Sequence, residues 1–227
     1  GGDDVVGGGV DEVDEHAAAL DVTEEAVAEA DAFVGSLDQA GDVGQHELPG
    51  VDADDAIPYR QVEIALEKSG TPYVILRPNW FSDNFHTFWK AGIAHGQITL
   101  PAAEGQSSFI DVRDIAQSAA AALTTDRFDG QAYNLTGPEA IGYGQAAQLL
   151  SAVIGKPVAY TPIDDQAFIT MLVGAGVSVD YAGFMAAIFY PVREGWAAAV
   201  TDHVQILTGK PPRSLETYAR DHVSVLR

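Results

Sequence analysis

The 227-residue sequence contains no cysteine, which excludes disulfide bonds and thiolate metal sites. It has no run of about 20 apolar residues that would span a membrane, and no basic-then-apolar signal segment opens it. From these absences we expect an intracellular, cytoplasmic protein. The six histidines include no H-x-x-x-H pair, and the chain has no G-x-S-x-G motif. We therefore expect neither a metal site nor a serine-hydrolase triad.

Basic residues are absent from the front of the chain. Residues 1–55 contain 17 Asp and Glu and no Lys or Arg, whereas residues 56–227 contain 16 acidic and 12 basic residues. The net charge of −21 repels nucleic acid and anionic membranes, so neither is an expected partner. The change in composition near Gly50 predicts an acidic, loosely packed lead over residues 1–50 and a folded domain over 51–227.

The front also lacks a phosphate-binding loop. Gly7–Gly9 follows only two valines, no lysine accompanies it, and four carboxylates crowd the next turn. Both the dinucleotide turn and the P-loop need a preceding strand, and the P-loop also needs a lysine. We therefore predict that this glycine cluster does not face a bound phosphate.

The remainder has the pattern of an α/β domain. A helix is predicted from Pro58 to Ser69, and the apolar run Tyr73–Leu76 is typical of a strand buried in a parallel sheet. Strands alternate with helices after it, which predicts a mainly parallel, Rossmann-like sheet. One of these helices should span Ser82–His95. Residues after about Leu135 should form a smaller, mostly helical lobe.

The strand at Tyr73–Leu76 is followed by Arg77 and then by Pro78, Asn79, Trp80 and Phe81. Ligands of open α/β sheets bind beyond the carboxyl ends of the strands. A proline, an amide and two large aromatic rings there suggest a floor for a flat ring. The alternative is that the two aromatic residues only pack at a strand–helix junction. Asp111 and Asp114 are read as a helix N-cap and a first-turn carboxylate, not as a catalytic pair.

Four segments in order resemble the NmrA-like, atypical branch of the short-chain dehydrogenase/reductase superfamily: IPYRQVEIALEKSGTPYVILRPNWFSDNF, SSFIDVRDIAQSAAAAL, GQAYNLTGPEAIGYGQAAQLLSAVIGKPVAY and LTGKPPRSLETYARDH. That branch includes type-2 NAD(P)H:quinone oxidoreductases, azoreductase-like proteins and redox-sensing regulators. The resemblance covers about Gly50 to Arg227 and implies a nucleotide-binding fold that is incomplete at its N-terminus.

The resemblance also assigns roles to residues. Tyr59 and Glu63 occupy the place of the superfamily's Tyr-x-x-x-Lys, so Tyr59 is the candidate catalytic residue. A carboxylate in place of the lysine disfavours the tyrosinate and argues against the usual acid–base dyad. The alternative is that Tyr59 packs and Glu63 is a solvated helix position. Pro78, Asn79, Trp80 and Phe81 match the segment that lies against the nicotinamide.

The helix after that segment carries Asn84, Phe85 and Trp89, which the resemblance assigns to an acceptor pocket, with core packing as the alternative. It implies an NAD(P)H-dependent oxidoreductase that transfers hydride to a quinone-like or azo acceptor, with NADP favoured over NAD. The alternatives are a non-catalytic NAD(P)-binding redox sensor and an inactive fragment. The expected partner is a small-molecule acceptor, and a homodimer or a protein partner stays open.

Overall fold

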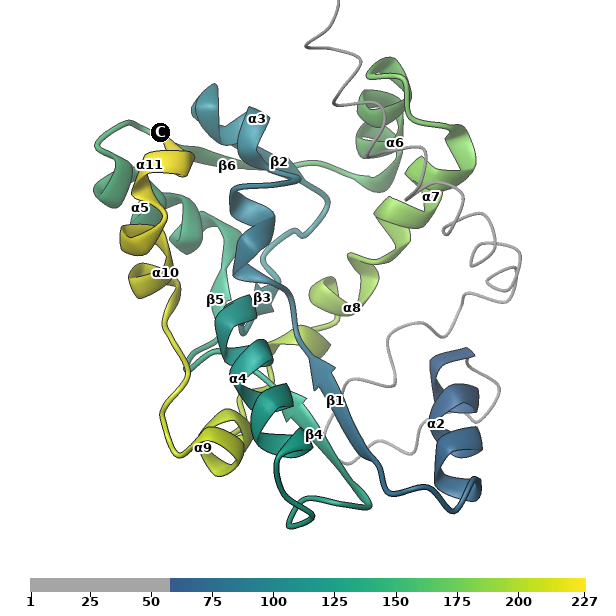
Figure 1. Ribbon diagram of the computed structural model, residues 1–227. Helices are drawn as coiled ribbons and strands as arrows, with labels where there is room; N and C mark the ends of the chain where they lie inside the picture. The colour runs from purple at the N-terminus through teal and green to yellow at the C-terminus, as the bar shows by residue number, and fades with distance from the viewer. Residues whose placement is uncertain (1–57) are drawn as a thin grey trace, which may run out of the picture. The chain divides into compact units, whose positions relative to one another are not determined.

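The computed structural model describes residues 58–227. The predictions made for the acidic lead and for Gly7–Gly9 lie outside the described residues. Within the described part, the α/β fold class is confirmed, since parallel strands alternate with helices along the chain (Figure 1).

Two of the three strand pairs are parallel. β1 (Val74–Pro78) pairs with β4 (Gln131–Leu135), and Val74 lies opposite Gln131. β2 (Gln97–Leu100) pairs with β6 (Ala159–Pro162). The third pair, β3 (Gln106–Ser107) with β5 (Ile141–Gly142), is antiparallel. The strand predicted from the apolar run at 73–76 is therefore present and extends two residues further.

The helix predicted from Pro58 and the helix predicted to follow Asp111 are both present among the described residues. The helices of this part of the chain are α2 (Pro58–Lys68), α3 (Lys90–Ala94), α4 (Val112–Leu123), α5 (Tyr143–Ile154), α6 (Asp165–Gly174), α7 (Val179–Ala187), α8 (Tyr190–Arg193), α9 (His203–Thr208), α10 (Leu215–Asp221) and α11 (Val223–Leu226), with 3₁₀ turns η2 (Ser82–Phe85) and η3 (Trp196–Ala198). None of the helices in the described part is long and apolar enough to cross a membrane.

The single helix predicted over Ser82–His95 is wrong. The chain forms η2, then turns, and becomes α-helical only at α3. Tertiary contacts override the apolar periodicity here: the side chain of Asp83 accepts a hydrogen bond from the Val112 N–H at the start of α4, at 3.3 Å. Fixing η2 against α4 in this way favours a tight 3₁₀ turn over a continuous helix.

Two hydrophobic cores hold the described residues together. The smaller one lies against β1 and β4 and includes Tyr133, Leu135 and, from α9, Val204 and Leu207. The larger one joins α5, β2, β6, α6 and α10 and also contains Phe85 and Phe109. The helical lobe is therefore not one continuous run after Leu135. The chain crosses into it before β4 and returns to the sheet at α9, because apolar side chains of α9 cover β4.

Candidate functional site at the end of β1

The segment that follows β1 is held as an extension of the strand. The Asn79 N–H donates to the carbonyl oxygen of Leu135 at 2.9 Å, at the end of β4. The Ile110 N–H donates to the Trp80 carbonyl at 2.8 Å, and the Ser82 N–H donates back to the Ile110 carbonyl at 2.8 Å. These bonds fix the backbone of residues 79–82 at the carboxyl end of a parallel strand pair, where α/β proteins bind ligands.

The side chain of Asn79 is a bridge between three segments. Its amide nitrogen donates to Ser108 Oγ at 2.6 Å and to the Ala197 carbonyl at 2.9 Å. Its amide oxygen accepts from the Trp80 N–H at 2.8 Å. Both amide protons are used, so this side chain has no donor left for a ligand. Sequence reasoning missed Ser108 and Ala197, because they lie 29 and 118 residues away and carry no local signal.

Two backbone groups of this segment have no hydrogen-bond partner among the described residues, the Asn79 C=O and the Phe81 N–H. Alternate residues of an extended chain direct their polar groups to opposite sides. Since Trp80 faces Ile110, these two groups face the other side, where Asn79 meets Leu135. One acceptor and one donor side by side complement a primary carboxamide, which is the group on the nicotinamide ring. The residues present therefore fit the nicotinamide end of the cofactor.

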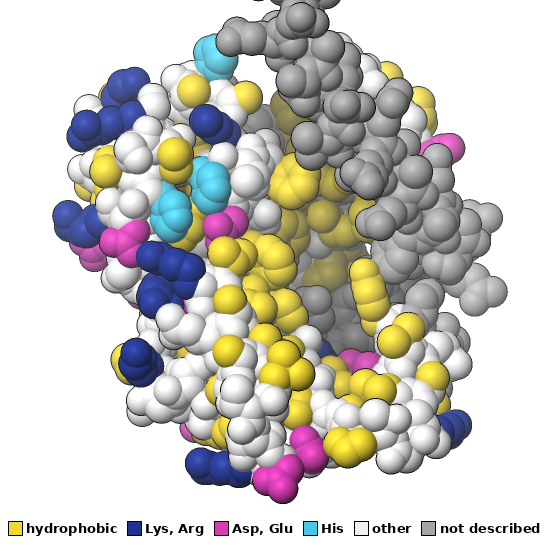
Figure 2. All heavy atoms as spheres, in the orientation of Figure 1, with side chains coloured by type: hydrophobic (Ala, Val, Ile, Leu, Met, Phe, Trp, Pro, Cys, Tyr) yellow, Lys and Arg dark blue, Asp and Glu magenta, His cyan; other side chains and the backbone are white. Residues whose placement is uncertain are grey.

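Aromatic rings cluster around Trp80, which lies between the two backbone groups in the sequence. The Trp80 ring lies 4.9 Å from Phe189 and 6.1 Å from Trp89, measured between ring centroids. Phe81 is 39% exposed, so its ring can meet a ligand. Apolar side chains gather near β1 on the face shown in Figure 2. Phe189, whose ring packs against Trp80, was not expected from the sequence.

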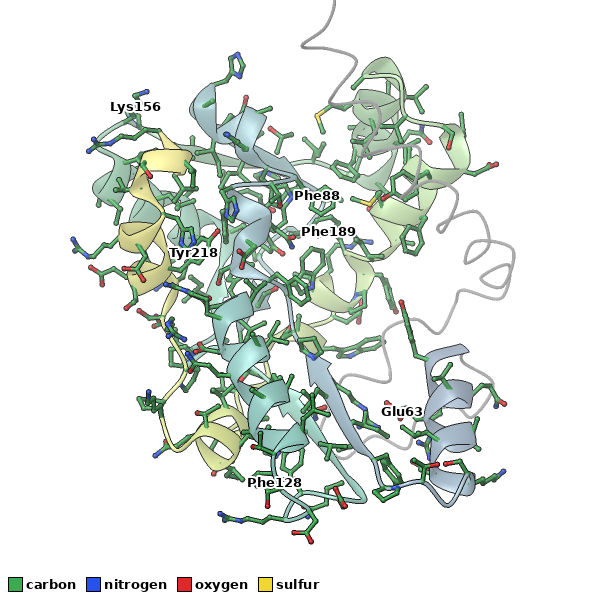
Figure 3. The ribbon with its side chains drawn as sticks, in the orientation of Figure 1. Glu63, Phe88, Phe128, Lys156, Phe189 and Tyr218 are labelled. Atoms are coloured by element: carbon green, nitrogen blue, oxygen red, sulfur yellow. The ribbon has the colours of Figure 1, made fainter. Side chains whose placement is uncertain are left out.

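The residues predicted for an acceptor pocket do not share one environment. Phe85 is fully buried, with its ring 4.8 Å from Trp89 and 5.1 Å from Phe109, so it lies in the larger core. Trp89 is half-buried and packs against the same core. Asn84 is half-buried at the surface of η2. By contrast, Phe88, which follows η2, is 71% exposed (Figure 3).

Tyr59 and Glu63 lie on α2, where Tyr59 is 68% exposed. The reading of Glu63 as a solvated position is wrong, because its carboxylate accepts from Arg77 Nε at 2.7 Å and from Arg60 Nη1 at 3.0 Å (Figure 3). Burial raises the pKa of Glu63, but the hydrogen bonds from Arg77 and Arg60 outweigh it and leave the pKa below its usual value. Two arginines share this charge, so Glu63 does not act on Tyr59 as an isolated anion.

Asp111 and Asp114 have the structural roles that their spacing predicts. Asp111 caps α4 by accepting from the Arg113 N–H at 2.8 Å. Burial raises the pKa of Asp111, but the Arg113 guanidinium and N–H outweigh burial and hold the pKa below its usual range. Asp114 is 2% exposed and binds both the backbone N–H and the guanidinium of Arg213. Both oxygens of each carboxylate accept hydrogen bonds from an arginine, so neither carboxylate is free for catalysis.

The chain is similar to several known proteins. It is 32% identical over 178 residues to prestalk A differentiation protein A of Dictyostelium discoideum, an alignment that covers 78% of this chain and 59% of that protein. It is 32% identical over 159 residues to the NAD(P)H azoreductase of Xenophilus azovorans, covering 70% of this chain and 56% of that protein. No protein-family model matches the sequence.

Among solved structures, the chain is similar to the NADPH-dependent quinone oxidoreductase of Escherichia coli in complex with NADPH. The two share 25% identity with a TM-score of 0.66, over 71% of this chain and 57% of the other. The chain thus spans less than two thirds of the length of each of these proteins. The four ordered segments, the parallel strand pair and these similarities agree, and the chain belongs to the NmrA-like, atypical branch of the short-chain dehydrogenase/reductase superfamily.

Proposed function

We propose that this chain carries the nicotinamide end and the acceptor side of an NAD(P)H-dependent oxidoreductase whose acceptor is quinone-like or an azo compound. The observation that carries the proposal is the Asn79 C=O and the Phe81 N–H at the end of β1, which have no hydrogen-bond partner within residues 58–227 and lie beside an exposed aromatic ring. The acceptor class rests on the names of the similar azoreductase and quinone oxidoreductase, and the preference for NADPH rests on the name of the quinone oxidoreductase alone.

In this proposal the chain binds and orients rather than supplying reactive groups. Asn79 and Phe81 hold the carboxamide through the backbone, and the bridge from Asn79 to Ser108 keeps that backbone in place. When bound, a reduced nicotinamide supplies the hydride. The rings of Trp80 and Phe189 exclude water from one side of the site. A quinone that accepts a hydride needs one further proton, and water at the exposed site supplies it, so no side-chain acid is required.

The test is NADPH oxidation by the 227-residue chain, measured with a panel of benzoquinones and an azo dye at millimolar cofactor. We expect turnover that depends on both cofactor and acceptor and that falls when Phe81 is changed as described in the Discussion. Binding of NADPH without turnover of any acceptor would contradict the enzyme and favour the redox-sensing regulator. If the chain shows neither NADPH binding nor turnover, it has the fold of the family without the proposed activity.

A further inference from the structure

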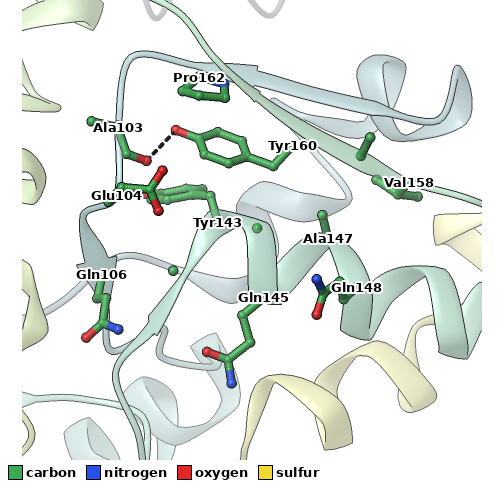
Figure 4. Close-up of a pocket in the computed structure, with 13 residues that line it drawn as sticks. Ala103, Glu104, Gln106, Tyr143, Gln145, Ala147, Gln148, Val158, Tyr160 and Pro162 are labelled. Atoms are coloured by element: carbon green, nitrogen blue, oxygen red, sulfur yellow. Dashed lines mark hydrogen bonds between the residues drawn. The ribbon is translucent and has the colours of Figure 1, made fainter.

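A pocket of about 600 Å³ lies away from the end of β1, beside the first turn of α5 (Figure 4). Ligand pockets usually range from about 300 to 1,000 Å³, so its size suits a small molecule. Tyr143 and Tyr160 are among the lining residues, with ring centroids 5.8 Å apart. Tyr143 is 1% exposed, so Tyr160 presents the aromatic wall that a ligand can contact. Tyr143 also contacts Phe189 at 6.2 Å, so the aromatic cluster separates this pocket from Trp80. Nothing in the proposed oxidoreductase function uses it.

The wall formed by Tyr160 is rigid. Its hydroxyl donates to the Ala103 carbonyl at 3.0 Å, and Ala103 has a left-handed backbone with φ of 47° (Figure 4). Burial and, to a lesser extent, the nearby charge of Glu104 raise the pKa of Tyr160 to about 12, against a smaller opposing effect of a backbone hydrogen bond, so the hydroxyl is neutral at physiological pH. The turn that holds Tyr160 in place therefore also carries Glu104 to the edge of the pocket.

Four polar side chains that line the pocket are not paired with other polar groups in the described residues. Within residues 58–227, the side chains of Glu104, Gln106, Gln145 and Gln148 have no hydrogen bond or ion pair, although all four line the pocket. No lysine or arginine lines it. The lining thus offers one unpaired carboxylate and three amide groups, whose oxygens can accept hydrogen bonds, next to the ring of Tyr160.

The pocket contains charges of both signs, and their magnitudes decide whether it favours a cation or an anion. The first turn of α5 has no side-chain cap, and a helix N-terminus carries roughly half a positive charge. Glu104 carries a full negative charge at neutral pH, and the described part of the chain adds a further net negative charge. A cation also gains from aromatic faces, by about 0.5–1 kcal/mol at exposed sites. The negative charge of Glu104 is therefore larger than the partial positive charge at the N-terminus of α5, and the pocket favours a cation.

From this lining we infer that the pocket binds a small organic cation, an amidinium, guanidinium or ammonium group on a flat apolar body. The flat body lies against the ring of Tyr160. Its N–H groups donate to Glu104 and to the glutamine amides. The protein offers no competing cation among the residues that line the pocket.

Three probes of one shape and different charge test the inference: benzamidine, benzamide and benzoate, each titrated into the full chain by calorimetry. We expect benzamidine to bind best and benzoate worst. Glu104→Gln should weaken benzamidine about fivefold, as loss of an exposed ion pair does, and leave benzamide unchanged. Glu194→Gln removes an exposed carboxylate outside the lining and should change nothing.

A second variant locates the binding. A Cβ at Gly144 would lie 3.9 Å from the Tyr160 ring, which is ordinary contact, so Gly144→Ala should be tolerated and Gly144→Leu should fill the pocket. We expect Gly144→Leu to abolish benzamidine binding while circular dichroism stays unchanged. Tighter binding of benzoate, equal binding of benzamide and benzamidine, no binding of any probe, or binding that survives Gly144→Leu would each overturn the inference.

Discussion

Glu63 and Arg77, 14 residues apart, form a two-point ion pair: Nε donates to Oε1 at 2.7 Å and Nη2 donates to Oε2 at 2.6 Å. This pair joins α2 to β1, and the Glu63 side chain is only 15% exposed. A pair of this geometry is stronger than an exposed salt bridge because both charges are oriented and partly removed from water. The ion pair therefore holds α2 against β1.

We predict that Glu63→Gln lowers the free energy of unfolding by about 1–2 kcal/mol at pH 7, as loss of charge-assisted hydrogen bonds does. The folded-state pKa of Glu63 lies below its usual value of 4.5, so the stabilisation is present above pH 4.5 and is lost as the pH falls through the folded-state pKa. Urea unfolding at several pH values measures this. The difference between the variant and the natural chain should shrink below pH 4.5; a constant difference would contradict the prediction.

Asp114 and Asp221 offer a matched comparison of a buried and an exposed carboxylate. Asp114 is 2% exposed and holds Arg213, whereas the Asp221 side chain is 45% exposed and pairs with Arg113 at 2.8 Å. Asp114→Ala leaves a partly buried arginine and a backbone N–H unpaired, which should cost about 2–4 kcal/mol. Asp221→Ala should cost under about 0.5 kcal/mol. Urea unfolding measures the loss in free energy of unfolding for each variant. Equal losses would contradict this prediction.

The sequence predicts features that depend on neighbouring residues, and it misses features that depend on residues far apart in the chain. Asp111 caps its helix as the spacing indicates, because a cap involves a neighbouring N–H two residues away. The break within 82–95 could not be predicted in this way, since it depends on Asp83 meeting Val112, 29 residues further along. The partners of Asn79 are equally distant. Spacing and periodicity therefore predict the strand and the helix cap next to the candidate site, while the bonds that support the site depend on the fold.

The Asn79 bridge should act as a cooperative unit. Asn79→Ala removes two donated bonds and one accepted bond and should cost about 2–3 kcal/mol, while Ser108→Ala should cost about 1 kcal/mol. The double variant should lose less than the sum of the two, because the same bond is counted in both. Urea unfolding of the three variants tests the coupling. Strict additivity would mean that the two side chains do not depend on each other.

The Phe81 N–H can be removed without disturbing the backbone. Phe81 has φ of −75° and ψ of 132°, which proline adopts readily, and its N–H makes no hydrogen bond in the described part of the chain. We predict that Phe81→Pro keeps the fold and weakens NADPH binding about tenfold, as loss of one buried hydrogen bond of about 1.4 kcal/mol would.

Phe81→Leu is the matched control, because it removes the ring but keeps the N–H. NADPH titration should place Phe81→Leu between the natural chain and Phe81→Pro. If both variants weaken binding equally, the aromatic ring and not the N–H is the important group. If neither changes it, the nicotinamide does not lie at the end of β1.

The 227-residue chain should bind NADPH only weakly, near millimolar. Much of the affinity for a dinucleotide comes from backbone N–H groups and a helix N-terminus that meet the pyrophosphate, and no sequence motif of that kind is present. The end of β1 offers orientation without charge neutralisation, since the nearby Arg77 is paired with Glu63. The 17 carboxylates of residues 1–55 add a field that repels an anionic ligand and is screened beyond about 8 Å at physiological salt. Fluorescence titration of NADPH at low and high salt should therefore show affinity that improves as salt rises. Micromolar binding, or binding that weakens with salt, would instead reveal a cationic phosphate site in this chain.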